Sequence, residues 1–338
     1  MVTGGTTRST STDMATILVT GGAGFVGSHV CKSLSRAGHA PVAYDDLSRG
    51  TRSAVKWGPL EVGDVLDHGR LRQVMADHQV SSVIHLAGLT VVHESVAEPL
   101  RYYQVNVAGT AAVLGAMRDA GVPTIVLSSS CTVYQDGPGG ALNEAAPLAP
   151  ASPYAQSKVM IEQLAADMAV AHGFRWLSLR YFNAAGADPA GELAERDVPK
   201  VRLIPNLLRA AAQGGASFKI QGADYPTADG TCVRDLVHVT DLAEAHVRAL
   251  RLLDHQPDSR FVNLGAGRGY SVREVLESVA RVTGRPVAAA TAPRRPGDVA
   301  VRIADATLAR RLLQWEPTWV SLDDIVAHAW RSRAWDHE

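Results

Sequence analysis

A tyrosine and a lysine four residues apart in a predicted helix have a spacing suited to proton chemistry. The helix is predicted to begin at Pro153, so Tyr154 and Lys158 project from the same face. A tyrosine is a poor base near neutral pH because its free pKa is about 10, but a neighbouring ammonium favours the phenolate. Ser128–Ser130 add three hydroxyls after the predicted strand 124–127. We interpret the group as a general base that takes a proton from a substrate hydroxyl; the alternative is a surface tyrosine beside a solvated lysine.

A glycine pattern near the start of the chain predicts a dinucleotide site. Gly21, Gly24 and Gly27 follow a predicted strand and open a predicted helix, and Asp45 follows about twenty positions later. The first glycine permits a tight turn, the second lets the backbone approach a pyrophosphate, and the third lets the helix pack on the sheet. Unpaired N–H groups at the helix start would bind the phosphates. The pattern favours an NAD site over an ordinary glycine turn. Hydride would pass to NAD while the phenolate takes the proton, and the positive nicotinamide ring would favour the phenolate together with the lysine ammonium.

Two acidic residues at the end of the second predicted strand indicate which dinucleotide binds. Asp45 can accept hydrogen bonds from the adenosine ribose, and Asp46 beside it would repel a 2′-phosphate, so we expect NAD rather than NADP. Arg49 and Arg52 lie close in sequence and weaken this exclusion. The alternative role for Asp45 is to cap a turn or helix.

The elements that must hold these residues alternate between strands and helices. The predicted strands are apolar without alternation, as in parallel sheets buried on both faces, and comprise residues 16–20, 41–44, 60–62, 82–86, 124–127 and 176–182. Helices are predicted over 25–36, before Gly38, and over 101–119, before Gly121. This order predicts an α/β fold: a doubly wound parallel sheet of Rossmann type with a smaller C-terminal α/β lobe for the substrate.

Three regions are predicted along the chain. Residues 1–13 are rich in serine and threonine and are expected to form a disordered leader. Residues 14–183 are expected to form the NAD-binding domain, and residues 184–338 mainly the substrate lobe, with some segments returning to the large domain. Within that lobe, Ser271 and Glu274 predict a capping box at the start of a helix.

Composition and charge argue against several classes of protein. The 338 residues are 46% hydrophobic and 20% charged, with a formal net charge of −1, so the chain lacks the basic excess typical of nucleic acid binding. Cys31, Cys131 and Cys232 are widely spaced, which argues against a disulfide framework and a structural metal site. Without a long apolar run or a signal peptide pattern, we expect a cytoplasmic protein with neither a membrane nor a nucleic acid partner.

Several longer stretches match the sequence of a known enzyme family. They are GGAGFVGSHV (21–30), VIHLAGL (83–89), ESV..PLRYY (94–103), NVAGT (106–110), SSSCTVY (128–134), SPYAQSK (152–158), LRYFNAAGA (179–187), ADYPTADGTCVRDLVHV (223–239), VNLGAG (262–267) and RRPGDV (294–299). Through them the chain resembles the extended short-chain dehydrogenase/reductases and, within these, the UDP-glucose 4-epimerases, from about Thr16 to Trp335. The resemblance implies interconversion of UDP-galactose and UDP-glucose through a transient 4-keto sugar, with bound NAD as hydride shuttle and a homodimer as the assembly.

The resemblance also implies roles for individual residues. Tyr154 would take the proton of the 4-hydroxyl, Lys158 would hold the nicotinamide ribose and bias Tyr154 toward phenolate, and Ser130 would bind the 4-oxygen. The residues expected to contact NAD are Gly21, Gly24, Phe25, Val26, Gly27, Asp45, Asp46, Leu47, Ser48, Asp64, Val65, Leu86, Ala87, Gly88, Asn106, Ser128, Tyr154, Lys158, Tyr181 and Phe182. Those expected to contact the UDP-sugar are Ser130, Tyr154, Asn183, Arg202, Leu203, Lys219, Gln221, Arg234, Arg295, Asp298 and Arg302.

Some of these residues also have plainer interpretations. Arg234 and Arg295 match ligands of the diphosphate, and Asp298 matches a ligand of the uridine ribose, but Arg234 could instead pair with the aspartate that follows it. Asn106 is expected mainly to tie the exit of the fourth strand to the next helix.

Five positions depart from the family pattern. Thr90 stands where a lysine near the cofactor phosphates is frequent, and His93 stands where a glycine is usual. Gln221 replaces an aromatic residue expected near the uracil, and Arg202 replaces an asparagine or histidine near the sugar phosphates. Arg302 occupies the position whose size gates N-acetylated sugars. It would crowd an acetamido group, pair with a sugar carboxylate, or extend to solvent.

The sequence leaves other functions to be weighed. One is 4-epimerisation of another UDP-sugar, UDP-glucuronate or an N-acetylhexosamine. A 4,6-dehydratase would need an Asp-Glu pair after the serine cluster, where this chain has Cys131 and Thr132. A protein that only binds NAD or a sugar nucleotide is disfavoured by the intact Ser130, Tyr154 and Lys158.

Overall fold

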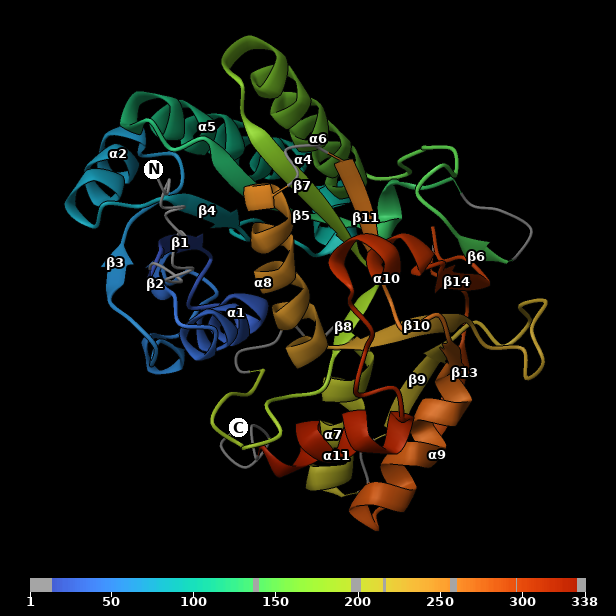
Figure 1. Cartoon of the computed structure of the whole chain (residues 1–338). Helices are drawn as coiled ribbons and strands as arrows, with labels where there is room; N and C mark the ends of the chain where they lie inside the picture. The colour runs from blue at the N-terminus through green and yellow to red at the C-terminus, as the bar shows by residue number, and fades with distance from the viewer. Residues whose placement is uncertain are drawn as a thin grey trace, which may run out of the picture.

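A computed structural model gives the fold of the chain (Figure 1). It describes residues 14–135, 140–195, 202–214, 217–255, 260–295 and 297–332. The predicted leader, residues 1–13, lies outside these ranges. Figure 1 shows a large sheet with helices on both faces, and a smaller group of helices and strands below it.

Parallel strands form the larger sheet and set the edge at which the predicted site residues stand. Their spatial order is β11 (Arg260–Leu264), β7 (Arg175–Tyr181), β5 (Thr124–Ser130), β4 (Ser82–His85), β1 (Thr16–Thr20), β2 (Ala40–Asp45) and β3 (Leu60–Val62). Each neighbouring pair is parallel. The chain order reverses between β1 and β4, the position at which doubly wound sheets bind ligands outside the carboxyl ends of their strands. The predicted doubly wound sheet is confirmed.

Helices cover both faces of this sheet because its strands are apolar on both sides. α1 (Phe25–Arg36) and α8 (Val239–His255) pack side by side on one face and share a core with the strands. On the other face lie α2 (His68–Asp77), α5 (Gly109–Ala120) and α6 (Pro153–His172). α8 and β11 come late in the sequence, yet both belong to the layers of the large sheet.

The helix predicted over residues 101–119 is wrong as a single element. The structure divides it into α4 (Pro99–Tyr102), a π-helical turn (Tyr103–Ala108) and α5, which ends at Gly121 in the left-handed conformation. The wide turn carries the buried Asn106, whose amide accepts from Leu89 N at 2.8 Å and donates to Leu89 O at 3.1 Å and to Ser157 Oγ at 3.0 Å. Asn106 thus ties the chain beyond β4 to this turn, as the sequence predicts, and also to α6, which was not predicted. These tertiary contacts prevail over a regular helix.

A second, smaller sheet lies beside the carboxyl edge of the first. Its order is β12 (Gly269–Ser271), β10 (Val233–His238), β14 (Val301–Ala304) and β6 (Ala141–Leu142), with β8 (Asn183–Ala185) also paired to β10. A separate pair is formed by β9 (Ser217–Gln221) and β13 (Ala288–Ala292). The helices α7 (Leu203–Gln213), α9 (Val272–Thr283) and α11 (Leu322–Arg331) share a hydrophobic core separate from those of the large sheet. The predicted capping box at Ser271 and Glu274 begins α9.

Short elements complete the described chain. They are the 3-10 turns Arg52–Ala54 and Cys131–Val133 and the helices α3 (Val92–Ala97) and α10 (Thr307–Leu313). Within the described ranges, no helix is both long and apolar enough to cross a bilayer.

Candidate active site

The glycine turn between β1 and α1 leaves room for an anion. Gly21 has a φ of +70° and donates its N–H to Tyr44 O at 2.8 Å, while a Cβ on Gly27 would lie 2.0 Å from Gly21 O. Gly24 caps the start of α1, and in the described chain no side chain bonds the first N–H groups of this helix. Free donors at the positive end of a three-turn helix are what a pyrophosphate requires. The residues present therefore fit the dinucleotide that the glycine pattern predicts.

Asp45 braces that turn from the end of β2. Its carboxylate accepts from Ala23 N at 3.0 Å and from Leu47 N at 2.8 Å, and 8% of the residue is exposed. Burial raises the pKa of this carboxyl, and the two backbone donors oppose the shift. Asp45 therefore caps the turn, which is the alternative role given for it above. Each carboxylate oxygen keeps a free lone pair, so the hydrogen bond from the adenosine ribose stays a prediction.

The surroundings of Asp46 bear on the choice between NAD and NADP. Asp46 Oδ1 accepts from Ser48 N at 2.9 Å and Ser48 Oγ at 2.7 Å, which keeps its negative charge at the exposed loop after β2. Of the two basic residues that could offset this charge, Arg49 lies 3.2 Å from Glu94, and Arg52 is exposed in the 3-10 turn Arg52–Ala54. Asp46 and the acidic partner of Arg49 favour a dinucleotide without a 2′-phosphate, and Arg52 still weakens this exclusion.

Backbone packing brings the glycine turn close to the predicted catalytic lysine. A Cβ on Gly21 would lie 2.7 Å from Ala87 N, and a Cβ on Gly88 would lie 3.9 Å from Lys158 Nζ. The loop Leu86–Gly88 after β4 thus lies between the glycine turn and Lys158, which are separated only by its backbone. At the neighbouring strand end, Asp64 O accepts from the hydroxyl of Tyr44 at 2.8 Å, and Val65 is buried.

Tyr154 and Lys158 project from the first two turns of α6 toward the end of β5. Ser152 caps this helix by accepting from Ala155 N, and Pro153 opens it, which fixes the register of both side chains. Lys158 Nζ donates to Ser128 O at 2.9 Å, lies 3.4 Å from Ser128 Oγ, and is 6.0 Å from the centroid of the Tyr154 ring. Burial lowers the pKa of Lys158 to about 8, and Glu162 opposes this through space.

Burial dominates the pKa of the Tyr154 phenol among the protein's own groups. Burial raises its pKa to about 12, and the groups that act to lower it are the hydroxyl of Ser130 and the positive charge of Arg202. Among the protein groups, desolvation of the phenol outweighs its neighbours, and the expectation that Lys158 together with the nicotinamide ring favours the phenolate stays a prediction. Ser130 Oγ also accepts from Thr132 N at 3.2 Å and from Thr132 Oγ1 at 3.0 Å, so its position at the strand end is fixed.

Arginines of the smaller sheet reach the same edge. Arg234 donates to Val299 O at 2.8 Å and lies 3.6 Å from Asp298, while the neighbouring Asp235 accepts from backbone N–H groups instead. The interpretation of Arg234 as the partner of the next aspartate is therefore wrong. Arg302 stands opposite Arg234 on β14 and donates to Cys131 O at 3.2 Å, half-buried, so it does not extend to solvent.

The remaining predicted residues are spread over several elements. Tyr181 hydrogen-bonds His246, Phe182 is buried beside Cys131, and Asn183 is exposed at the start of β8. Arg202 precedes α7 and Leu203 begins it, whereas Lys219 and Gln221 lie on β9 and Arg295 is exposed beyond β13. Phe25 and Val26 begin α1. Among the residues that the structure describes, no group of three His, Cys, Asp or Glu side chains could hold a metal ion.

A buried carboxylate near the site, Glu195, was not predicted from the sequence. Glu195 is 8% exposed and lies 2.7 Å from Arg202, whose guanidinium carbon is 5.7 Å from the centroid of the Phe25 ring. Burial raises the pKa of Glu195, and Arg202 opposes the shift. The sequence signal was the series Asp188, Glu192 and Glu195, spaced four and three residues apart in a Gly/Pro-rich stretch.

Comparisons with known proteins agree with this geometry. The model of the NAD dependent epimerase/dehydratase family matches residues 17–265. UDP-glucose 4-epimerase of Rhizobium leguminosarum bv. trifolii is 42% identical over 315 residues, 93% of this chain and 96% of that protein.

Solved structures show the same similarity in three dimensions. UDP-glucose 4-epimerase from Brucella ovis in complex with NAD superposes with a TM-score of 0.91 at 44% identity, covering 94% of this chain and 97% of that one. UDP-glucose-4-epimerase from Stenotrophomonas maltophila, with bound NAD and formylated UDP-arabinopyranose, gives 0.92 at 39% identity, covering 95% and 99%.

Proposed function

The chain belongs to the NAD dependent epimerase/dehydratase family, and from this we propose that it is a UDP-glucose 4-epimerase that interconverts UDP-galactose and UDP-glucose. The observation that carries the proposal is the meeting of Tyr154, Lys158 and Ser130 at the strand edge beside an open glycine turn. This arrangement provides a proton acceptor next to a dinucleotide site, as oxidation of a sugar carbon requires.

The residues around the glycine turn would hold NAD. The first N–H groups of α1 would bind its pyrophosphate, Asp45 its adenosine ribose, and Lys158 its nicotinamide ribose. When bound, NAD supplies a reversible hydride acceptor for carbon 4 of the sugar.

The side chains at the edge of the large sheet would manage the proton. Tyr154 would take the proton of the 4-hydroxyl, and Ser130, bonded to the phenol, would share it with the 4-oxygen. The ammonium of Lys158 would favour the phenolate as it forms. Once the keto sugar has rotated to present its other face, return of the hydride to carbon 4 and of the proton from Tyr154 to the 4-oxygen would give the inverted alcohol.

Arg234 on β10 and the exposed Arg295 beyond β13 would hold the nucleotide while the sugar turns. Arg234 and Arg295 would bind the diphosphate through charge-assisted hydrogen bonds, and Asp298 the uridine ribose. A firm grip on the UDP and a loose one on the hexose is the condition for presenting either face of carbon 4.

Arg302 supports a second candidate substrate. It is fixed to Cys131 O, one residue from Ser130, so a cation stands beside the proposed sugar site. There it would crowd an acetamido group or pair with the carboxylate of UDP-glucuronate. Cys131 and Thr132 occupy the positions where a 4,6-dehydratase needs an acid pair, so dehydration is disfavoured.

The substrate is tested by incubating the purified protein, without added cofactor, with UDP-galactose, UDP-N-acetylgalactosamine and UDP-glucuronate, followed by chromatography of the products. We expect conversion of UDP-galactose to UDP-glucose and no conversion of the N-acetylated sugar. Turnover of UDP-glucuronate alone would assign Arg302 to the carboxylate. Conversion of none of the three would overturn the proposed function.

The Tyr154→Phe variant separates an enzyme from a protein that only binds its ligands. We expect it to keep its NAD content and to lose turnover by about a thousandfold or more, because the proton acceptor is gone. Turnover is measured by chromatography and NAD by absorbance after denaturation. Unchanged turnover would refute the assigned role of the phenol.

We also propose that the protein is a cytoplasmic homodimer. Exposed apolar side chains on α3, α4 and α6 support an interface, with Val96 63%, Leu100 82% and Met160 38% exposed, and α3 and α4 both pack on α6. Light scattering after gel filtration tests the dimer. Leu100→Glu should yield monomers, whereas an unchanged mass would place the interface elsewhere; cell fractionation tests the compartment.

A further inference from the structure

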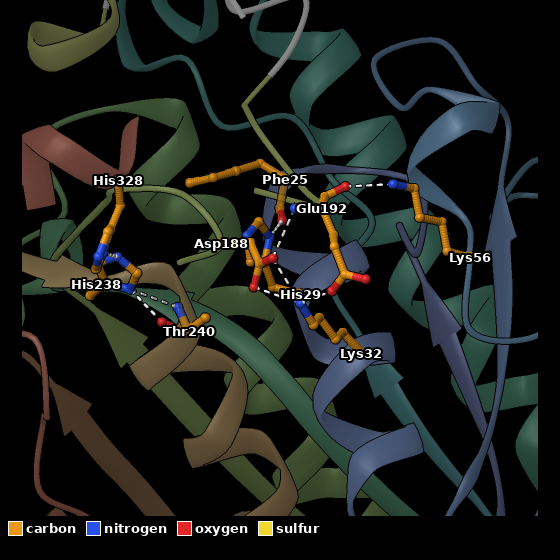
Figure 2. Close-up of polar contacts among 9 residues, drawn as sticks. All are labelled: Phe25, His29, Lys32, Lys56, Asp188, Glu192, His238, Thr240 and His328. Carbon is orange, nitrogen blue, oxygen red and sulfur yellow. Dashed lines mark hydrogen bonds and ion pairs between the residues drawn. The ribbon is translucent and has the colours of Figure 1, made fainter. Parts of the chain in front are cut away.

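A buried ion pair joins the cofactor helix α1 to the loop 186–195 that follows β8 (Figure 2). Lys32 on α1 is 3% exposed, and its Nζ lies 2.7 Å from both carboxylate oxygens of Asp188. Glu192 contacts the same ammonium from the more exposed side, with 48% of its side chain exposed. Residues 156 positions apart in the sequence are thereby fixed to each other.

Asp188 also shapes the loop itself. Its backbone O accepts from Gly191 N at 2.9 Å, its N–H donates to Leu193 O at 3.2 Å, and its Oδ2 accepts from Glu192 N at 3.0 Å. Lys56 adds a contact from the opposite side, with Nζ 2.6 Å from Glu192 O (Figure 2). The loop is therefore a compact turn wound around one carboxylate and not an open connection.

The charge balance at this point depends on Lys32. Burial opposes ionisation of Asp188, but the bonds from Lys32 and from Glu192 N outweigh it and hold the pKa of this carboxyl below its usual range. His29 lies one turn earlier on α1, and burial lowers its pKa to about 4, so the imidazole is neutral at pH 7. Lys32 is therefore the charge that keeps Asp188 ionised in a buried position.

The loop meets α1 a second time at the helix start. Glu195, at the end of the loop, lies 2.7 Å from Arg202, and Arg202 faces the ring of Phe25 in the first turn of α1. His29 packs edge-on against the same ring, with centroids 5.4 Å apart. Phe25, His29 and Lys32 lie four and three residues apart and so share one face of the helix.

We propose that Lys32 and Asp188 are positioning residues for the sugar-nucleotide half of the reaction: their ion pair seats the loop 186–195 on α1 and thereby places Glu195 against Arg202, whose guanidinium faces Phe25. This inference rests on the proposed function. The helix whose first turn would hold the cofactor phosphates also fixes, two turns later, the loop whose Glu195 pairs with Arg202. Arg202 is in turn one of the two groups that favour ionisation of Tyr154. The position of the loop thus affects both the substrate contact proposed for Arg202 and the charge near the base Tyr154.

The test uses the NAD-loaded enzyme with Asp188→Asn, which removes the charge but keeps the shape of the side chain. We expect the Kd for UDP, measured by calorimetry, and the KM for UDP-galactose to rise about tenfold, the scale of coupling between linked sites. NAD content should stay unchanged, and kcat should fall less than KM rises. A purely structural role would lower the Tm and leave the affinity for UDP unchanged, which would overturn the proposal.

A milder variant and a matched control cover a failure of Asp188→Asn to fold. Glu192→Gln loses only the more exposed partner of Lys32 and should weaken UDP binding in the same direction by a smaller factor. Glu244→Gln breaks a comparable ion pair, with Arg248 on α8, whose glutamate side chain is 51% exposed, and should leave UDP binding unchanged. Equal UDP affinity in wild type and Glu192→Gln would overturn the proposal.

Calorimetry separates this inference from the proposed function because UDP binding requires no turnover. If the wild type binds UDP but converts no UDP-sugar, and Asp188→Asn still weakens UDP, then the positioning role stands and the proposed activity fails. If UDP-galactose is converted and the variants bind UDP as the wild type does, the activity stands and the positioning role fails.

Discussion

Two buried lysines, Lys32 and Lys158, are equally shielded from solvent but have opposite surroundings. Each residue is 3% exposed. Lys32 meets the carboxylates of Asp188 and Glu192, whereas Lys158 donates to the carbonyl and lies near the hydroxyl of Ser128. The acid closest in sequence to Lys158, Glu162, is bonded to Arg180 and acts on the lysine only through space. The first ammonium is neutralised and the second is not.

The contrast shows that the fold uses one buried lysine, Lys32, to fix a loop and leaves the other, Lys158, available for the proposed reaction. Burial lowers the pKa of Lys158 from 10.5 to about 8. Since a tenfold change in an ionisation constant corresponds to about 1.4 kcal/mol, keeping this ammonium charged costs about 3 kcal/mol. An ammonium without a carboxylate partner remains available to a phenolate or to a ribose hydroxyl, the roles that we propose for it. Lys32 has no such freedom, because its charge is committed to the loop.

The largest effect on turnover is expected from replacing Lys158, whose charge has no carboxylate partner within hydrogen-bond distance in the described chain. Lys158→Met should lower the turnover of UDP-galactose by about a thousandfold, because the phenolate of Tyr154 loses its cation and the ribose loses a donor. Initial rates with protein of known NAD content provide the measurement. A variant that keeps more than a tenth of wild-type turnover would remove Lys158 from the proposed chemistry.

Replacing Lys32, whose charge is neutralised by carboxylates, should mainly lower the free energy of unfolding. Lys32→Met leaves the buried carboxylate of Asp188 without its cation and should lower the free energy of unfolding by about 3–5 kcal/mol. Lys32→Met/Asp188→Leu replaces both charges with apolar groups and should recover more than half of the loss. Urea denaturation of both variants is the measurement. If the double variant is no more stable than the single one, the charge balance is not what stabilises this region.

The two lysine regions should also respond to pH at opposite ends of the scale. Since the folded pKa of Lys158 is about 8 and its ordinary value is 10.5, the cost of its charge is full below pH 8 and disappears as pH rises to 10.5. The stability difference between Lys158→Met and wild type should therefore shrink over this interval. The Asp188 carboxyl, with its pKa below 3.8, stabilises the fold above that pH and loses the contribution as acid protonates it.

Unfolding free energies measured from pH 3 to 10.5 test both expectations. A stability difference between Lys158→Met and wild type that stays constant from pH 8 to 10.5 would contradict the low pKa of Lys158.

The smallest effect should come from an ion pair at the surface. Arg281 lies 2.8 Å from Asp323, with 56% and 47% of the two side chains exposed. Arg281→Gln should change the free energy of unfolding by no more than about 0.5 kcal/mol, because water replaces the lost partner. A loss as large as that of Lys32→Met would show that burial does not decide the strength of these pairs.

Local patterns predicted the parts of the site that depend on neighbours in sequence. The ends of α1 and the first turn of α6 were predicted correctly because the glycine pattern, Pro153 and the helical period are local signals. The division of the 101–119 segment was not predictable, since it follows from contacts between Asn106 and residues of two other segments.

The long-range ion pairs had no local signal. Lys32 and Asp188 lie on segments that meet only in the folded chain, and the spacing of residues in either segment does not name its partner. The burial that raises the pKa of Tyr154 could not be predicted for a related reason: it is a property of the packed site, whereas the Tyr-Lys spacing indicates only a neighbour on the same helix.

The most direct test of the contrast between the two lysines is the sign of one stability change. With NAD removed, the free energy of unfolding of Lys158→Met at pH 7 should be higher than that of wild type by roughly 1–3 kcal/mol, because the variant lacks an uncompensated buried charge. Destabilisation, in the direction expected for Lys32→Met, would contradict it and show that Lys158 is held by contacts as favourable as those of Lys32.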